Sequence, residues 1–471
     1  MDNGSMMANE PGDDMIDPSQ GDNFDQINEN PFIKVSDEPS SSFSVDADGA
    51  SYSYMRRCIS RGVKPSPDAV RVEEFLNYFT FDYPSPTGDE TLAVNAEIGD
   101  CPWAEGHKLL RIGLKGKEIN EADMPPANFI FLVDTSGSMS GEDRIELLKS
   151  GLCNLVDKLR PTDRVAIITY SGSVTMLLES TLAKDAGKIK KAIRSLLASG
   201  STAGGQAMKM AYDEATEHYV KGGNNRIIMC TDGDFNVGVT STEALVEMVE
   251  SYLDKGIYLS IMGFGTGNYY DSRMESLSNH GNGTYNYIDC EDEMMKVFVH
   301  ERSRFFSVAN DTKCQVRFTE NVDSYRLIGY ENRVMSNDDF ENDKKDAGEI
   351  GAGQTITALY ELIPAETYTM GANAALIEVK YKKNLGDESR SLTANTGIPT
   401  YDGFKPSSEF GFAAGLAAYA LTLRDSKYKG TASLEMATDL IKPAEKPGAK
   451  VDPLGLRTRL LELIAKAKST N

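Results

Sequence analysis

Residues 128–138 read NFIFLVDTSGS and carry the most informative structural pattern in the chain. Its first part, 128–133, is an almost unbroken apolar run, as expected of a strand that is covered on both faces of a sheet. The segment 145–159 then carries its large apolar residues on one helical stripe and ends at Arg160-Pro161. The polar loop 134–138 is therefore predicted to join the carboxyl end of a buried strand to a helix.

The same alternation of strand and helix continues through residues 127–305. We expect strands at 128–133, 165–170, 174–178, 227–230, 257–262 and 284–288, and helices at 145–159, 207–220, 242–253, 271–277 and 292–304. Strands that alternate with helices predict a Rossmann-like α/β domain, with a mostly parallel sheet flanked by helices.

The two flanks have a different character. Residues 31–90 are expected to form a helical cap, with helices at 52–61 and 70–79. Residues 91–126 and 306–385 alternate apolar and polar residues as strands do, with a polar loop at 336–346. Residues 386–471 are expected to be helical, including 410–423, which is apolar nearly all round, and 456–467. We therefore predict a multidomain chain in which 91–126 pairs with 306–385 as one β-sandwich, and the α/β domain is inserted into it.

Charge restricts the class of partner. The 471 residues include 49 Lys and Arg against 71 Asp and Glu, so the net charge is −22. A chain this acidic repels nucleic acid, and no apolar run approaches the length that spans a bilayer. Six dispersed cysteines without a CxxC pair leave the redox compartment open.

The first 30 residues are predicted to be a disordered acidic tether. They contain eight acidic side chains and no basic one, and they cannot bury enough apolar surface to fold. No basic start followed by an apolar stretch is present, so the chain is either cytoplasmic or a mature or trimmed form.

Three polar segments are expected to meet at the carboxyl edge of the α/β sheet. The first offers Asp134, Ser136 and Ser138, with Gly137 permitting a tight turn; the second, 200–205, offers Thr202; the third, 231–233, offers Asp232. Carboxylate and hydroxyl oxygens are the donors that Mg²⁺ prefers. Asp-x-Ser-x-Ser alone often only caps a helix, but three such segments in order favour a metal site.

These residues resemble the metal-ion-dependent adhesion site of von Willebrand factor A domains. The resemblance implies that Asp134, Ser136, Ser138, Thr202 and Asp232 hold one Mg²⁺ (or Mn²⁺), with the aspartates often acting through water. It also implies a vacant coordination position that a Glu or Asp of a partner protein fills. Asp234 and Asn236 could line the rim, although local loop hydrogen bonds explain them as well.

The flanks resemble a narrower group, the bacterial YfbK-like proteins. The similarity rests on FSVD at 43–46, RVEEFLNYF at 71–79 and the C-terminal helices, and it covers most of 35–470. Members of that group often look like envelope lipoproteins, which implies a lipid-tethered envelope protein. No cysteine precedes Cys58 to carry such a lipid, so the cytoplasm stays open as an alternative.

We therefore predict a non-enzymatic, metal-dependent protein-binding module with no catalytic residue and no organic cofactor. One alternative is a structural scaffold of an envelope or ATPase-associated complex. Another is a metal-dependent hydrolase, which needs a general base near the ion and for which Asp234 is the one weak candidate. The run 263–267 with Asp289 beyond it superficially resembles a dinucleotide fingerprint, but its spacing misses G-x-G-x-x-G.

Overall fold

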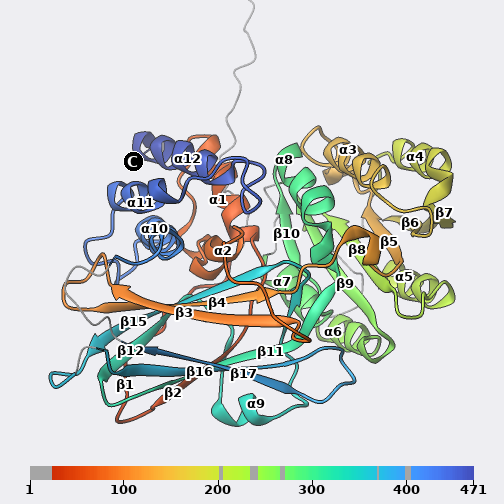
Figure 1. Ribbon diagram of the computed structural model, residues 1–471. Coiled ribbons are helices and arrows are strands. Elements are labelled where there is room, and N and C mark those ends of the chain that lie inside the picture. Colours follow the sequence, from red (N-terminus) through yellow and green to blue (C-terminus); the bar gives the residue numbers. More distant parts are fainter. Residues whose placement is uncertain are drawn as a thin grey trace, which may run out of the picture.

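The chain folds into three connected parts: an α/β domain, a β-sandwich and a cluster of helices (Figure 1). The computed structural model describes residues 24–200, 205–233, 242–265, 271–368, 371–397 and 405–470. Residues 1–23 of the predicted disordered tether lie outside these residues. Residues 24–30 are described and contact the folded part, where the Asn30 side chain donates to the carbonyls of Leu327 and Gly329. Within the described residues, no helix combines the length and the apolar character that crossing a membrane would require.

The α/β domain is built on one six-stranded sheet in the order β10-β9-β8-β5-β6-β7. Its strands are β5 (Ala127–Asp134), β6 (Arg164–Ser171), β7 (Ser173–Leu182), β8 (Asn224–Thr231), β9 (Ile257–Phe264) and β10 (Tyr285–Ile288). All pairs are parallel except the edge pair of β6 with β7. The helices are α3 (Ile145–Val156), α4 (Ala186–Arg194), α5 (Gly205–Glu217), α6 (Thr242–Glu250), α7 (Asp271–Asn279) and α8 (Glu291–Met295). The Rossmann-like prediction is confirmed.

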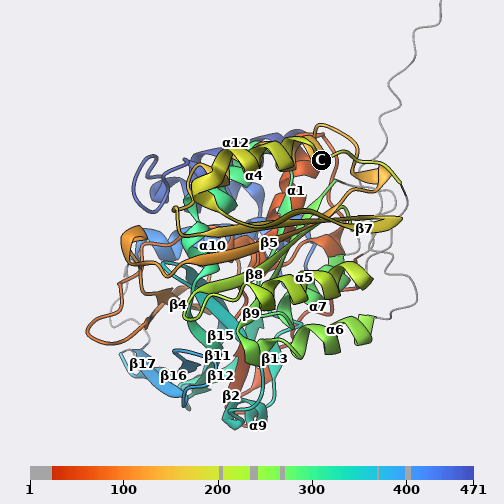
Figure 2. The same cartoon turned by 90° about the vertical axis from the view of Figure 1, so that its right-hand side faces the viewer.

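Strand β5 lies inside this sheet, between β8 and β6, and both of its faces are covered. Ile130 and Leu132 pack into the core on the α5 and α6 side, whereas Phe131 and Val133 pack into the core on the α3 and α4 side. Figure 2 shows α4 on one side of the sheet and α5, α6 and α7 on the other. Alternate side chains of a strand point to opposite faces, so only a continuous apolar run satisfies both cores.

The second part is a sandwich of two mainly antiparallel sheets. One has the order β1-β12-β15-β4-β3 and the other β13-β2-β11-β16-β17, with β14 paired to β11. The strands are β1 (Ile33–Lys34), β2 (Ser40–Ser44), β3 (Leu92–Asp100), β4 (Lys108–Gly116), β11 (Ser307–Phe318), β12 (Val322–Ile328), β13 (Val334–Met335), β14 (Gly348–Gly351), β15 (Thr355–Pro364), β16 (Asn373–Lys382) and β17 (Arg390–Gly397). Strand β4 precedes the α/β domain and pairs with β15 beyond it, with Ile112 opposite Ala358. The α/β domain is therefore inserted in the sandwich, as predicted.

Three strands of the sandwich lie outside the ranges expected for it: the two-residue β1 in the predicted helical cap, and the longer β2 and β17. Strand β2, SSSFS, comes from the predicted helical cap, and β17, RSLTANTG, comes from the predicted helical C-terminal region. Both are mostly polar, so no apolar alternation marks them. They are strands because their backbones pair with β11 and β16.

Helix predictions failed in three places. The predicted loop 336–346 contains α9 (Asn337–Glu341), whose first turn is capped by the Ser336 hydroxyl and whose Phe340 is fully buried. The predicted helix 292–304 is α8 followed by a π turn at Lys296–His300 and a 3₁₀ turn at Arg302–Phe305. Helix α4 was not expected, because it carries only two buried apolar side chains.

The third part gathers helices from both ends of the chain. It contains α1 (Ala50–Ser60), α2 (Val72–Asn77), α10 (Ser408–Leu423), α11 (Leu434–Ile441) and α12 (Leu456–Thr470). Helix α10 is buried on nearly every side, packed on α2 and α11. An all-apolar helix therefore serves here as core.

Candidate metal centre

Asp134 closes strand β5 and begins the first loop of the candidate site. Its side chain is fully buried, and its Oδ1 accepts a 2.8 Å hydrogen bond from the backbone N–H of Ser136. This bond turns the chain sharply at the end of the strand, as Asp side chains commonly do. The turn places the hydroxyl of Ser136 beside the end of β5.

Ser136 and Ser138 present neighbouring hydroxyls. Their Oγ atoms are 2.9 Å apart, and Ser138 is exposed whereas Ser136 is buried. Gly137 between them lies in a short 3₁₀ turn, and a Cβ there would meet the carbonyl oxygen of Gly200 only at an ordinary 3.8 Å. Gly137 permits this tight turn, as expected, but the space around it would also accept a Cβ.

The second loop is tied to the first by backbone hydrogen bonds. The N–H of Ser199 donates to the carbonyl of Thr135 at 2.7 Å, and the N–H of Gly137 donates to that of Gly200 at 3.1 Å. The hydroxyl of Ser171, at the end of β6, donates to the carbonyl of Ser199 at 2.9 Å. Thr202 itself lies outside the described residues, two positions beyond this clamp.

The third segment follows β8, the neighbour of β5. Asp232 is 6 % exposed, and the Thr231 hydroxyl donates to Asp134 Oδ2 at 3.3 Å. Gly233 has a φ of +92°, a conformation that favours glycine, and its N–H donates to the Thr231 hydroxyl at 3.2 Å. The segment therefore crosses the sheet edge beside Asp134; Asp234 and Asn236 lie outside the described residues.

Burial is the main influence on the ionisation of Asp134. Desolvation raises the pKa of Asp134 to about 6; the hydrogen bonds from Ser136 and Thr231 oppose this shift, and the charge of Asp232 adds to it. Burial and then the Asp134 charge raise the pKa of Tyr170, which lies opposite Asp134 in the β5–β6 register. Two carboxylates with neighbouring hydroxyls in a desolvated site suit a divalent cation.

Two residues that position the site were not predicted to do so. Thr231 lies within the third segment, but only its neighbour Asp232 was expected to contribute. Tyr170 lies on β6, and nothing in its local sequence indicates that it borders Asp134. Its position follows from strand pairing, which brings residues 36 positions apart side by side.

The described residues do not support a dinucleotide-binding site at 263–267. Gly265 has a φ of +74°, and its carbonyl accepts a 2.6 Å hydrogen bond from the hydroxyl of Tyr287. Asp289 pairs with Arg56 of α1. Both residues therefore have structural contacts, while Thr266 and Gly267 lie outside the described residues.

An open α/β sheet with Asp134, Ser136 and Asp232 at its carboxyl edge defines a von Willebrand factor type A domain. The model of that domain matches residues 129–234, and a second von Willebrand factor model matches 18–111. The model of the C-terminal part of the uncharacterized protein YfbK matches 303–470.

The chain belongs to the YfbK family of von Willebrand factor A domain proteins. It is 37 % identical over 467 residues to the uncharacterized protein YfbK of Escherichia coli K12, covering 94 % of this chain and 80 % of the relative. Inter-alpha-trypsin inhibitor heavy chain H3 of Mesocricetus auratus is 28 % identical over 42 % of this chain and 23 % of its own.

Solved structures are similar at lower identity. A von Willebrand factor type A structure from Catenulispora acidiphila is 15 % identical and covers 75 % of this chain and 87 % of its own, with a TM-score of 0.43. The conserved hypothetical protein BatB of Bacteroides thetaiotaomicron is 23 % identical and covers 38 % and 98 %, with a TM-score of 0.33.

Proposed function

We propose that this chain is a non-enzymatic protein-binding module whose A domain binds a partner through one metal ion. Asp134, Ser136, Ser138, Thr202 and Asp232 would hold Mg²⁺ (or Mn²⁺), and a Glu or Asp of the partner would complete the coordination. The observation that carries the proposal is the buried Asp134 carboxylate, which lies beside the Ser136 hydroxyl and within the field of Asp232.

The charges support an open site rather than a closed one. Two carboxylates neutralise one divalent ion, and Mg²⁺ keeps exchangeable waters that an incoming carboxylate can replace. Ser138 is exposed beside the buried Ser136, so the donor set faces solvent on one side. A partner's acidic side chain can approach from that side.

A binding role also agrees with the chemistry around the site. A metal-dependent hydrolase needs a general base close to the ion. Three of the four histidines make polar contacts elsewhere: His107 with Glu361, His218 with Glu214, and His280 with Ser276. We therefore expect no turnover of a panel of esters and phosphate esters in the presence of Mn²⁺.

Calorimetric titration of the full chain with Mg²⁺ and Mn²⁺ tests the metal site. The wild type should bind one ion, and Asp134→Asn and Ser136→Ala should weaken binding at least about tenfold. Ser140→Ala is the matched control, because Ser140 is an exposed hydroxyl of the same loop. Failure of the folded wild type to bind, or unchanged binding by Asp134→Asn, would overturn the proposal.

The open coordination position has its own test. Water-proton relaxation of the Mn²⁺ complex should report exchangeable water on the ion. Millimolar Ac-Gly-Glu-Gly-amide should lower that relaxation, and the matching Gln peptide should not. Equal effects of both peptides would favour the scaffold alternative.

The envelope location rests on the similarity of the flanks to the YfbK family, and fractionation of cells that express the precursor tests it.

A further inference from the structure

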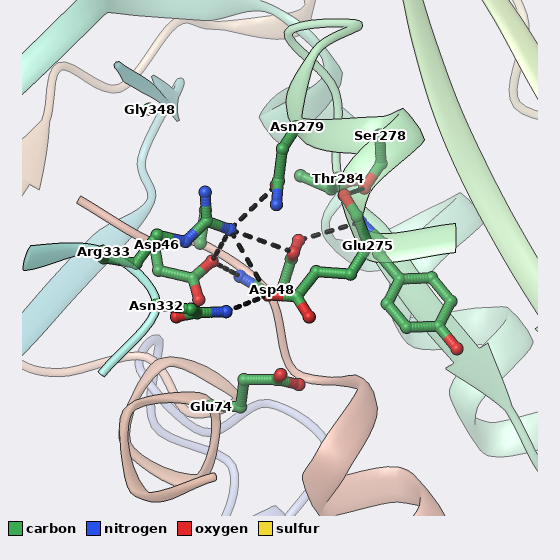
Figure 3. Close-up of polar contacts among 12 residues, drawn as sticks. Asp46, Asp48, Glu74, Glu275, Ser278, Asn279, Thr284, Asn332, Arg333 and Gly348 are labelled. Carbon is green, nitrogen blue, oxygen red and sulfur yellow. Dashed lines mark hydrogen bonds and ion pairs between the residues drawn. The ribbon is translucent and has the colours of Figure 1, made fainter. Parts of the chain in front are cut away.

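A cavity of about 720 Å³ lies between the α/β domain and the β-sandwich. Its walls come from α7, from the segment 44–48 between β2 and α1, and from the segments 331–335 and 345–349 of the sandwich. None of its lining residues belongs to the candidate metal centre. Figure 3 shows Asp46, Asp48, Glu275 and Asn279 gathered around the guanidinium of Arg333.

Arg333 is shared among more carboxylates than it can neutralise. Its Nη2 donates to Asn279 Oδ1 at 2.8 Å and to Asp46 Oδ1 at 3.3 Å. The same atom is 3.9 Å from both Asp48 Oδ2 and Glu275 Oε1. Glu275 also pairs with Arg71, so Asp46 and Asp48 are the two carboxylates that share Arg333.

The cavity lining as a whole is strongly acidic. Among the residues that the structure describes, it contains ten Asp and Glu side chains, against two arginines and one lysine. Asp46, Asp48 and Glu73 are 3, 2 and 1 % exposed, and each has one carboxylate oxygen, Oδ2 or Oε2, that is buried without a hydrogen-bond partner. Buried carboxylate oxygens are normally satisfied by a donor or a cation. These three side chains form the first acidic pole of the cavity.

A second acidic pole lies at the sandwich wall. Asp346 and Glu349 line the cavity, and with Asp311 they bring carboxylate oxygens within 4.8 Å of one another. Lys382 pairs with Asp311 at 2.6 Å, but Glu349 Oε1 is buried without a hydrogen-bond partner. This second pole therefore also carries more negative charge than its visible partners neutralise.

Burial among other negative charges raises the pKa of several carboxyl groups in the cavity lining. Desolvation, then the charges of Glu331 and Asp46, raises the pKa of Glu73 to about 8. The pKa values of Asp48 and Glu349 rise for the same reasons. A positive ligand would let these groups ionise.

We propose that this cavity binds a small linear organic cation with at least two ammonium groups, one at the pole of Asp46, Asp48 and Glu73 and the other at the pole of Asp346 and Glu349. A single metal ion is far smaller than the cavity, whose volume is typical of small-molecule sites. A divalent ion at the first pole would also be repelled by Arg333. An ammonium group carries three donors and one charge, which suits carboxylates already shared with a guanidinium.

Calorimetric titration of the full chain with spermidine as the probe tests the inference. One saturable site is expected, and Asp48→Asn should weaken it at least about tenfold. Asparagine keeps an oxygen for the Tyr285 N–H, which Asp48 Oδ1 accepts at 2.8 Å, so the local fold should survive. Glu349→Gln at the other pole is the second variant, and it should weaken spermidine more than a monoamine of similar length.

Two controls separate this site from general acidity and from the proposed metal function. Asp213→Asn removes one charge from an exposed pair on α5 and should leave spermidine binding unchanged. Asp134→Asn should also bind spermidine normally, whatever it does to Mg²⁺. No saturable binding, equal weakening by Asp213→Asn, or displacement of spermidine by equimolar Ca²⁺ would overturn the inference.

Discussion

Arg56 of α1 and Asp289, which follows β10, form a bidentate ion pair across 233 residues of sequence. Arg56 Nε is 2.9 Å from Asp289 Oδ2, and Nη2 is 2.5 Å from Oδ1. The same guanidinium contacts Glu293 Oε2 at 2.7 Å and the hydroxyl of Tyr78 at 2.6 Å. One arginine thus joins the helical cluster to the α/β domain. Its partner, Asp289, is the aspartate of the sequence pattern that superficially resembles a dinucleotide fingerprint.

Replacing Arg56 should destabilise the chain strongly. Asp289 and Glu293 have side chains only 7 and 2 % exposed. Arg56→Met leaves the buried Asp289 without its cation and leaves Glu293 with Lys296 alone, at about 3–5 kcal/mol. Urea denaturation measures this loss. Lys209→Met, which breaks a pair whose side chains are 67 and 57 % exposed, should change the free energy of unfolding far less. Comparable losses in the two variants would contradict the interpretation.

The raised pKa of Glu73 predicts a pH dependence of stability. The unfolded chain releases this proton near pH 4.5, but the folded chain keeps it until about pH 8. The free energy of unfolding should therefore fall as pH rises between these values, by at most about 1.4 kcal/mol per pH unit. Glu73→Gln removes this contribution, so the variant should gain on the wild type from pH 5 to 8. Parallel stability curves would show that Glu73 does not cause the slope.

Two glycines should respond oppositely to alanine. A methyl group at Gly283, just before β10, would overlap the backbone carbonyl of Leu259 in the neighbouring strand, so Gly283→Ala should lower the melting temperature by several degrees. Gly187 in α4 has no atom within 4 Å of its added Cβ, so Gly187→Ala should stabilise by about 0.5 kcal/mol. Calorimetric melting of both variants tests the pair.

The docking of α12 should depend on Arg457 and Glu409. Arg457 is 1 % exposed, and its two terminal nitrogens contact the two Glu409 oxygens at 2.9 and 2.8 Å. Glu409→Gln leaves a buried guanidinium without its counter-charge and should speed hydrogen exchange in α12. Glu435→Gln is the control. It breaks a more exposed pair between Glu435 of α11 and Lys468 of α12, and it should have no such effect.

Metal binding should also appear as stabilisation. A ligand that binds only the folded state at about 100 times its Kd adds about 2.7 kcal/mol. Millimolar Mg²⁺ should therefore raise the melting temperature of the wild type, and EDTA should reverse the shift. The melting temperature of Asp134→Asn should not respond to either addition.

Local patterns were sufficient where burial is two-sided or one-sided along a whole element. The run at 128–133 predicted β5, and the apolar helix at 410–423 predicted α10, because continuous burial leaves continuous apolar sequence. The first and third loops of the candidate site followed from the same logic, since polar residues after buried strands must lie at the sheet edge. Strand β2 was missed because SSSFS contributes backbone pairing more than apolar burial.

The α/β domain, its insertion between two β segments and the residue types at the sheet edge could therefore all be predicted from local patterns. The contacts between distant charges could not, because they depend on how the whole chain folds. Arg333 lies beside Asp46 and Glu275, and Arg56 lies beside Asp289. No local sequence pattern around either arginine predicts these partners. Buried apolar residues recur with the period of a helix or strand, so a short stretch of sequence reveals them. An ion pair between distant segments forms only where the folded surfaces come into contact.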